Sequence, residues 1–286
     1  MKYAYYPGCS LHATAAEFDS STKAVCNQLG VELQEIPDWN CCGASSAHNS
    51  SHFLASAIPG RNLILAEQMG LDVASPCAAC YQRLKVADHH LKHDDKLRNK
   101  MTEITGHNYQ GQYQVKNIVD VIVDNFDISK ATKTLNKLKV VCYYGCLMVR
   151  PGKLTGIDNT ENPQTMDNIL EELGAEVIQW PYKAECCGGS SPLYDAELAL
   201  KLIRDILKVA KDSGAQAIVT ACPLCMSNLD MRQVAVEKKY GESFKLPILY
   251  FTELVGLALG IPAQKLGLTD KHFVEPMECL RSQKVI

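Results

Sequence analysis

The sequence of 286 residues lacks several patterns that mark common functional classes. Basic residues are not in excess, since 29 lysines and arginines stand against 32 acidic residues and the net charge is −3. The absence of a basic stripe argues against a nucleic-acid-binding protein. The glycine pattern of nucleotide and flavin sites is missing, and so is the closely spaced four-cysteine run of ferredoxin-type cubane clusters. The sequence therefore carries no motif by which this chain would bind a nucleotide, a flavin or a ferredoxin-type cluster.

A long apolar run is also missing. The most apolar stretch, residues 246–262, is short and is interrupted by Thr252 and Glu253. A membrane-spanning helix needs about 20 apolar residues, so we predict that this stretch belongs to the core and that the chain is not itself membrane-spanning. The first nine residues lack the apolar run of a signal peptide. We expect a cytoplasmic location, with any membrane association made through partners.

Cysteine, in contrast, is abundant, and ten of the thirteen cysteines form a five-cysteine pattern that occurs twice. The first set is Cys9, Cys41, Cys42, Cys77 and Cys80; the second set is Cys146, Cys186, Cys187, Cys222 and Cys225. In both copies, 34 residues separate the double cysteine from the CxxC pair. In a reducing cytosol, cysteines rarely form disulfides, and they are good metal ligands. The pattern therefore indicates a duplicated site for a soft metal.

The duplication extends beyond the cysteines and predicts the domains. Cys-Cys-Gly-Ala-Ser-Ser at residues 41–46 matches Cys-Cys-Gly-Gly-Ser-Ser at 186–191. We expect a first domain at residues 1–130, a second at 138–262 and a C-terminal extension at 263–286. The polar stretch 127–137 would link the two domains. Each repeat is expected to close on an apolar helix, at residues 115–126 and 248–260.

Strand and helix patterns alternate within each repeat. The expected strands are residues 2–6, 31–36, 71–75, 140–144, 176–180 and 217–220. The expected helices are 18–29, 51–69, 164–173, 196–211 and two more that begin after Cys77 and at Pro223. We expect Pro59-Gly60 to break or kink the helix at 51–69. This alternation predicts an α/β fold of two tandem, internally duplicated domains, each a small parallel sheet covered by helices. Because every patterned cysteine follows a strand, the metal sites should lie at the strand carboxyl ends.

The number of cysteines bears on the metal. A structural zinc site and a cubane iron–sulfur cluster each take four ligands, whereas each set here offers five, including an adjacent pair. Five thiolates suggest an iron–sulfur cluster of unusual shape. The glycine after each double cysteine allows close backbone approach, and each CxxC is expected at a helix N-terminus, which favours thiolate. Zinc at one or both sites is the alternative, and a thioredoxin-like dithiol would leave six of the cysteines unexplained.

The two five-cysteine motifs resemble the CCG-domain family over residues 5–260, and the chain is most similar there to the B subunits of heterodisulfide reductase. In that family each motif is associated with a noncubane [4Fe–4S] cluster held by five cysteines. The resemblance implies that the first set, Cys9, Cys41, Cys42, Cys77 and Cys80, binds one cluster. The second set, Cys146, Cys186, Cys187, Cys222 and Cys225, would bind the other.

The resemblance also implies a function. The family enzyme is a disulfide oxidoreductase that acts on a sulfur group, with the disulfide between two facing clusters that each deliver one electron. Its partners are a ferredoxin-like iron–sulfur subunit, called the C subunit, together with a flavin protein, the A subunit. The alternative is an electron-transfer or docking subunit of a succinate dehydrogenase-like or a lactate or glycolate oxidation complex. The small disulfide or thiol that would be the substrate stays unspecified.

Several residues outside the two sets are secondary candidates. His12 and His48 flank expected ligands and could supply protons, although loop histidines at the surface are the simpler interpretation. The histidine-rich run at 88–93 looks metal-binding, but its spacing favours a solvated helix face. Arg150 and Lys153 follow Cys146 and could bind an acidic substrate, against the simpler interpretation of a surface loop.

Other residues have structural interpretations. Cys26 and Cys142 are expected in the core, while Cys279 has no assigned role. Four tyrosines stand in pairs before Cys9 and Cys146, and we expect them to shield the clusters from water, with hydroxyls that could also donate to sulfur. They are Tyr5, Tyr6, Tyr143 and Tyr144.

Overall fold

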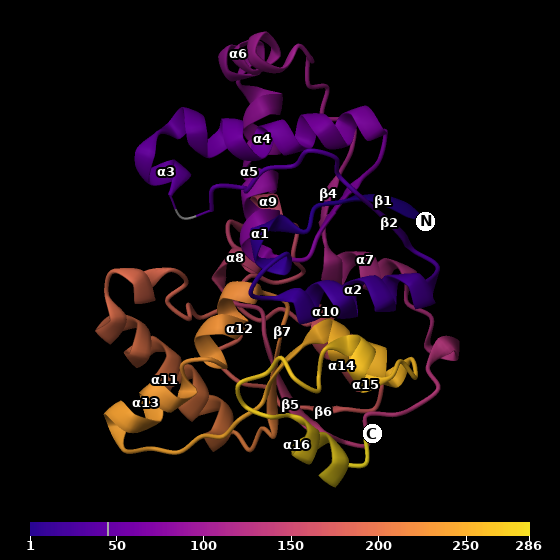
Figure 1. The fold of residues 1–286 in the computed structure, drawn as a ribbon, viewed down its shortest axis with the longest axis vertical. Helices are drawn as coiled ribbons and strands as arrows, with labels where there is room; N and C mark the ends of the chain where they lie inside the picture. The colour runs from indigo at the N-terminus through magenta and orange to yellow at the C-terminus, as the bar shows by residue number, and fades with distance from the viewer. Residues whose placement is uncertain (45) are drawn as a thin grey trace.

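The structure is a computed structural model that describes residues 1–44 and 46–286, apart from the side chain of His48. It contains two four-stranded parallel sheets, one in each repeat, with the strand orders β2-β1-β3-β4 and β6-β5-β7-β8 (Figure 1). The first sheet consists of β1 (Lys2–Tyr5), β2 (Glu32–Glu35), β3 (Val73–Ser75) and β4 (Val115–Asn117). The second consists of β5 (Lys139–Tyr143), β6 (Glu176–Val177), β7 (Ala217–Thr220) and β8 (Ile248–Tyr250). The predicted α/β class and its duplication are confirmed.

Helices connect the strands and cover the sheets. In the first repeat they are α1 (Gly8–Leu11), α2 (Ala16–Leu29), α3 (Ala47–Ser50), α4 (His52–Met69), α5 (Ala78–His93), α6 (Asp95–Thr105) and α7 (Ile118–Asn125), with the 3₁₀ turn η1 (Ile128–Lys130) after them. In the second they are α8 (Cys146–Val149), α9 (Gly152–Thr155), α10 (Thr165–Glu172), α11 (Ala196–Asp212), α12 (Pro223–Leu229), α13 (Gln233–Tyr240) and α14 (Phe251–Ala258), with η2 (Ser191–Leu193). The extension carries α15 (Ala263–Leu266) and α16 (Met277–Ser282). Among the described residues, no helix is long and apolar enough to cross a membrane.

Three local predictions need correction. The apolar helix expected to close each repeat is a short buried strand followed by a helix, β4–α7 and β8–α14. A three-residue strand is too short to show a period, so periodicity cannot separate it from the helix that follows. The strand expected at 176–180 is reduced to β6, Glu176–Val177. Helix α4 runs through Pro59 without a break, because it packs closely on α5: a Cβ at Gly60 would lie 3.0 Å from the Leu91 side chain. Packing outweighs propensity here.

The two repeats pack through helices that flank the carboxyl ends of their strands. Helix α2 of the first repeat lies against α14 of the second (Figure 1). The rings of Phe18 and Tyr250 stack across this contact with centroids 4.1 Å apart, and the Ser21 and Thr252 hydroxyls are hydrogen-bonded at 2.7 Å. Helix α5 contacts α8 and α9, where the Tyr81 hydroxyl donates to the Thr155 carbonyl. We call this junction between the repeats the seam.

Candidate metal centre

The first cysteine set comes together at the carboxyl end of the first sheet. Cys9 lies in α1 directly after β1, Cys41 and Cys42 follow β2, and Cys77 caps α5 after β3. The Cys41 and Cys9 Sγ atoms are 3.8 Å apart, and the Cys42 and Cys80 Sγ atoms are 3.3 Å apart. Three segments distant in sequence therefore bring their thiols to one place, as parallel strands require of residues at their carboxyl ends.

The second set repeats this arrangement. Cys146 begins α8 after β5, and Cys222 caps α12 after β7. The Cys146 and Cys186 Sγ atoms are 3.8 Å apart, and those of Cys187 and Cys225 are 3.6 Å apart. Equivalent cysteines pair in the two sets, so the two repeats share the arrangement of their thiols as well as their sequence pattern.

The two sets meet at the seam through the first cysteine of each CxxC pair. Hydrogen bonding with Cys222 is the main cause that raises the pKa of Cys77. Hydrogen bonding with Cys225 and then with Cys77 lowers the pKa of Cys222. Both side chains are buried. The two CxxC segments therefore lie close together at the seam, and Leu224 of the second segment lines the cavity of the first cysteine set.

Polar groups around the sulfurs favour thiolate. The Gly188 amide donates to Cys186 Sγ at 3.3 Å, and the Asn228 amide nitrogen lies 3.5 Å from Cys187 Sγ. Hydrogen bonding with Cys146 is the main cause that lowers the pKa of Cys186 to about 6. Backbone amides and side-chain donors of this kind stabilise anionic sulfur.

Sequence reasoning missed some of these groups. In the first repeat, hydrogen bonding with Cys41 and Cys80 lowers the pKa of Cys42, and the Arg83 guanidinium adds to the effect. Neither Arg83 nor Asn228 is marked by a motif. The only sequence signal is their place three residues after Cys80 and Cys225, one helical turn along α5 and α12.

A glycine precedes the first cysteine of each set, and the structure shows why. A Cβ on Gly8 would lie 2.8 Å from Cys80 Sγ, and one on Gly145 would lie 3.0 Å from Cys225 Sγ. Gly145 also has φ 67° and ψ 178°, a combination that is essentially restricted to glycine. The two glycines let the chain pass close to the sulfurs.

We expect Gly145→Ala to displace Cys225 and to lower the metal content of the second site. The strained backbone should add about 1–3 kcal/mol to the loss of stability. Gly156→Ala is the matched control, since Gly156 has φ 67° but no atom within 4 Å of the added Cβ. Metal analysis and thermal unfolding of both variants check this. Equal metal loss in the two variants would contradict the close-approach explanation.

The first set lines a cavity of about 210 Å³. Its wall is completed by Leu224 of the second repeat. Leu224 occupies the position in its CxxC pair that Ala79 occupies in the first pair. The cavity between these thiols is therefore the space that a cluster would fill, and the second repeat contributes to its wall.

The donor set fits a multi-iron cluster. The closest sulfurs of each set lie 3.3–3.8 Å apart, and each set offers five thiols. A mononuclear tetrahedral zinc site needs four ligands around one point. All thirteen cysteines are free thiols. Two sets of five thiols, with amide donors aimed at sulfur, suit an iron–sulfur cluster bound by thiolates.

Of the two histidine candidates for a proton donor, the structure describes the side chain of His12 alone. His12 lies on the outer face, where its Nε2 is 3.3 Å from Glu35 Oε1 and its ring is 5.1 Å from the Trp39 ring. The side chain of His48 lies outside the described residues. His12 therefore gives no support to the hypothesis that a histidine supplies protons to the site, because it already has an acidic partner in Glu35.

The four tyrosines are buried, but they do not act as one group. Tyr6 and Tyr143 lie next to the cysteines, and after burial these thiols are the main causes that raise the pKa of each tyrosine. Their hydroxyls donate to the carbonyls of Asn40 and Glu185, both at 2.7 Å. The expectation that the tyrosines could donate to sulfur is therefore wrong for these two, since backbone carbonyls take both hydroxyls.

The other pair points elsewhere. The Tyr5 hydroxyl donates to Asp19 Oδ1 and the Tyr144 hydroxyl to Asp167 Oδ2, both at 2.8 Å. Carboxylates hold both hydroxyls, so this pair does not donate to sulfur either. The signal that separates the pairs is the glycine that follows: Tyr6 and Tyr143 stand two residues before Gly8 and Gly145.

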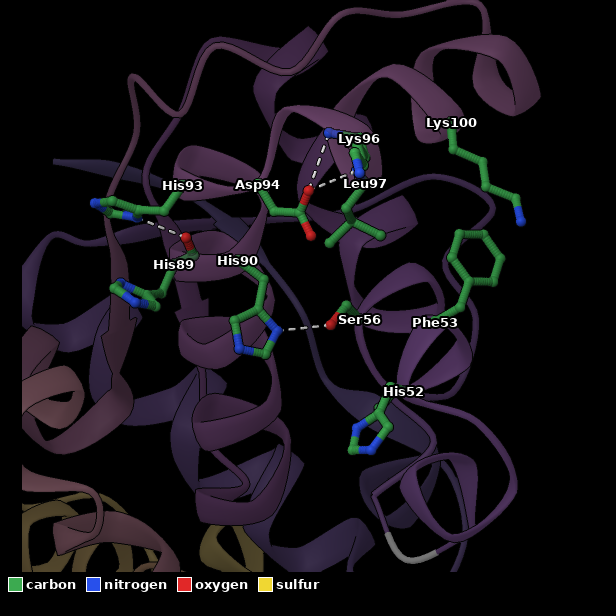
Figure 2. Close-up of a pocket in the computed structure, with 11 residues that line it drawn as sticks. His52, Phe53, Ser56, His89, His90, His93, Asp94, Lys96, Leu97 and Lys100 are labelled. Atoms are coloured by element: carbon green, nitrogen blue, oxygen red, sulfur yellow. Dashed lines mark hydrogen bonds between the residues drawn. The ribbon is translucent and has the colours of Figure 1, made fainter.

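The histidine-rich run lies at the end of α5, with Leu91 buried and its histidines more exposed. His52, His89, His90 and His93 line a cavity of about 580 Å³ (Figure 2). His90 Nδ1 is 2.8 Å from the Ser56 hydroxyl, and His93 Nδ1 is 2.7 Å from the His89 carbonyl. These contacts confirm a solvated helix face whose histidines bond to local groups.

The cysteines outside the two sets and the basic residues after Cys146 lie as expected. Cys26 and Cys142 are buried core residues, and Cys279 is half-buried with its thiol 3.7 Å from the Gln216 carbonyl. Arg150 and Lys153 are exposed, and Arg150 is 3.3 Å from Glu161. Arg150 still contributes to lowering the pKa of Cys186, so it lies near the second site.

Comparison with known proteins agrees with this geometry. The family described as cysteine-rich domain (CCG) matches residues 3–85 and 140–230. The chain is 38% identical to the "8-methylmenaquinol:fumarate reductase membrane anchor subunit" of Wolinella succinogenes, over 93% of this chain and 95% of that protein. It is 29% identical to the B subunit of the ferredoxin/F(420)H(2)-dependent CoB-CoM heterodisulfide reductase of Methanosarcina acetivorans, over 98% and 96% of the two chains.

Among solved structures, a hypothetical protein from Helicobacter pylori has a similar fold. It superposes with a TM-score of 0.76 at 13% identity, over 96% of this chain and 52% of that protein. At this identity the likeness concerns the fold alone, and the chain spans about half of that protein. Two matched segments, each with a complete five-cysteine set, show that the chain belongs to the cysteine-rich CCG domain family.

Proposed function

We propose that this chain is an iron–sulfur redox subunit that reduces or forms a disulfide at two facing noncubane [4Fe–4S] clusters. The observation that carries the proposal is that two equivalent five-cysteine sets adjoin at the seam, where Leu224 of the second CxxC pair lines the cavity of the first set. The proposed ligands are all ten patterned cysteines. They are Cys9, Cys41, Cys42, Cys77 and Cys80 for one cluster, and Cys146, Cys186, Cys187, Cys222 and Cys225 for the other.

Electron counting supports the facing arrangement. Reducing a disulfide takes two electrons, and a bound cluster would supply one electron at a time. Two adjacent sites of equal composition can together deliver the pair to one substrate. The chain's own contribution is to hold the thiolates and to exclude water with Tyr6 and Tyr143, while Leu224 forms the wall where the first site meets the second repeat.

The proposed units follow the two cysteine sets: residues 1–130, 138–262 and an extension at 263–286. Because the sequence carries no nucleotide, flavin or ferredoxin motif, partner subunits would supply the electrons. The proposed partners are a ferredoxin-like iron–sulfur subunit, with a flavin subunit beyond it.

A second candidate is an electron-transfer subunit of a fumarate reductase-like complex, with zinc at one site as a variant of this interpretation. The observation that favours it is the 38% identity to the Wolinella succinogenes protein, against 29% to the Methanosarcina acetivorans protein. The two candidates share the clusters and differ in whether a substrate sulfur binds at iron.

The test is metal analysis and EPR on anaerobically purified protein, before and after addition of a small disulfide or thiol. We expect about eight irons per chain, as two clusters require, and an EPR signal that changes when thiol is added. About four irons with one zinc, and no response to thiol, would overturn the disulfide proposal and favour the electron-transfer candidate.

A further inference from the structure

The C-terminal extension, which carries none of the patterned cysteines, packs against both repeats. Helix α15 lies against α2 of the first repeat and α14 of the second (Figure 1). A Cβ on Gly267 would lie 2.9 Å from Glu17 Cα in α2. One on Gly256, in α14, would lie 3.0 Å from Leu266 Cδ1. The first part of the extension therefore bridges the repeats beside the seam.

The next part of the extension is held by two buried acids. Glu253 Oε1, in the first turn of α14, is 2.9 Å from His272 Nε2, with side chains 0% and 2% exposed. The buried Asp230 carboxylate accepts the backbone amides of Phe273 at 2.8 Å and of Val274 at 2.9 Å. Residues 272–274 of the extension are thus fixed to the second repeat by printed side-chain bonds at consecutive positions.

Asp230 also ends the helix that carries the second CxxC pair. Helix α12 has Cys222 as its N-cap, contains Cys225 and has Asp230 as its C-cap. The Asp230 amide donates to the Met226 carbonyl at 2.8 Å, and the Met226 amide donates to the Cys222 carbonyl at 2.9 Å. Consecutive helical hydrogen bonds therefore connect the anchor of the extension with a patterned cysteine.

The same helix holds the double cysteine of the second set. The Asn228 side-chain amide donates to the Cys187 carbonyl at 3.0 Å and to the Gly189 carbonyl at 2.9 Å. Asn228 is buried and lies two residues before Asp230. A displacement of α12 would therefore move the CxxC pair and loosen the segment that carries Cys187.

We propose that residues 263–274 of the extension are a clamp that positions α12, and with it the second cysteine set, against the first repeat. His272 and Asp230 are its positioning residues. His272 fixes the extension to α14 through Glu253, and Asp230 fixes the end of α12 to the extension. The clamp rests on the proposed function only in that the second set binds a metal cluster.

The charges around His272 favour a closed clamp at neutral pH. Burial lowers the pKa of His272, but Glu253 outweighs burial and raises it to about 9. Asp230, at the end of α12, and Glu17, in α2, act in the same direction as Glu253, and Lys271 acts on Glu17. Because a free histidine has a pKa of about 6.5, the stabilisation is complete below about pH 6.5 and is lost as the pH rises through about 9.

The experiment compares His272→Gln with wild type in the cluster-loaded protein at pH 7, by the rate at which an excess of chelator removes iron. The variant leaves buried Glu253 without its cation. We expect the iron of the second site to leave about tenfold faster, as a local opening predicts, and the iron of the first site to leave at the wild-type rate. In wild type, the same selective acceleration should appear between pH 7 and about pH 9.5.

Peptide-resolved hydrogen exchange identifies the site that opens. We expect faster exchange in residues 222–230 of the variant and unchanged exchange in residues 77–84, which hold the equivalent CxxC pair of the first repeat. A general loss of stability would accelerate exchange and iron release at both sites alike. These two readouts therefore separate a positioning role from a merely structural one, and neither depends on turnover.

The matched control is His107→Gln. His107 Nε2 is 3.2 Å from Glu67 Oε2, and Glu67 accepts the backbone amides of Gln110 at 2.9 Å and of Gln112 at 3.3 Å. The same kind of contact thus fixes a loop between α6 and β4, which carries no patterned cysteine. This variant should leave iron release from both sites unchanged.

If His272→Gln does not fold, Asp230→Asn carries the test. Asparagine keeps the size of the side chain and one acceptor oxygen, and it removes the charge. The same selective release of iron is expected. Equal acceleration at both sites, or release at the wild-type rate from the second site, overturns the clamp.

The clamp and the disulfide function fail separately. A protein that reduces no disulfide, but whose second site alone loses metal faster in His272→Gln, would refute the disulfide function and support the clamp. A protein that reduces disulfides and whose variants release iron from both sites at one rate would overturn the clamp alone.

Discussion

Replacing Cys187 by serine is expected to remove the second cluster and disulfide reductase activity together. Cys187 is buried, its sulfur is 3.6 Å from Cys225 Sγ, and Asn228 lies 3.5 Å away. A serine hydroxyl is a poor ligand for iron where thiolates are required. Iron should fall from about eight to about four atoms per chain. Because both sites must each deliver one electron, turnover should be lost and not merely halved.

Cys26→Ser is the control for this prediction. Cys26 is also fully buried, but it lies in α2 outside the two sets. The Cys26→Ser variant should keep its full iron content and activity, with at most a loss of stability. Iron quantitation, EPR and disulfide turnover on both variants give the answer. Full iron content and turnover in Cys187→Ser would show that Cys187 is not a ligand.

Replacing Lys183 by methionine should lower the free energy of unfolding by about 3–5 kcal/mol, because it leaves a buried charge unpaired. Lys183 Nζ is 2.6 Å from Asp167 Oδ1, with both side chains 1% exposed. Asp167 Oδ2 accepts the Tyr144 hydroxyl at 2.8 Å. The Lys183 carbonyl also accepts the amides of Tyr144 and Gly145. The pair therefore supports the backbone that leads into Cys146.

Lys208→Met is the matched control for that prediction. Lys208 makes an exposed ion pair with Asp212 at 3.0 Å, one helical turn away, and such pairs contribute only about 0.3–0.5 kcal/mol. In denaturant unfolding, the loss of unfolding free energy should be several-fold larger for Lys183→Met than for Lys208→Met. A loss no larger for Lys183→Met than for Lys208→Met would show that the buried pair is not stabilising.

The sequence was sufficient for the broad plan of the molecule. Cysteine spacing marked the repeat, and strand-then-cysteine order placed both sets at the carboxyl ends of parallel strands, where the structure has them. Pro223 marked the start of α12 for a local reason, since proline suits the first helical turn. Such features depend on neighbours in sequence.

The features that could not be predicted from the sequence depend on contacts between residues that are distant along the chain. The short strands β4 and β8 exist because neighbouring strands pair with them, and their three residues carry no period of their own. The stacking of Phe18 on Tyr250 and the hydrogen bond between Ser21 and Thr252 join the two repeats across more than two hundred positions. No spacing rule within one repeat indicates them.

The wall of the cavity beside the first cysteine set has a consequence for how such a molecule diverges. Ala79 and Leu224 hold equivalent positions in the two CxxC pairs, yet one is small and the other large, and both line the same opening. A homodimer of one repeat would carry the same residue on both sides and could only widen or narrow both together. Fusion of two copies in one chain lets each side change alone, so the wall between the two sites can change while both five-cysteine sets are kept.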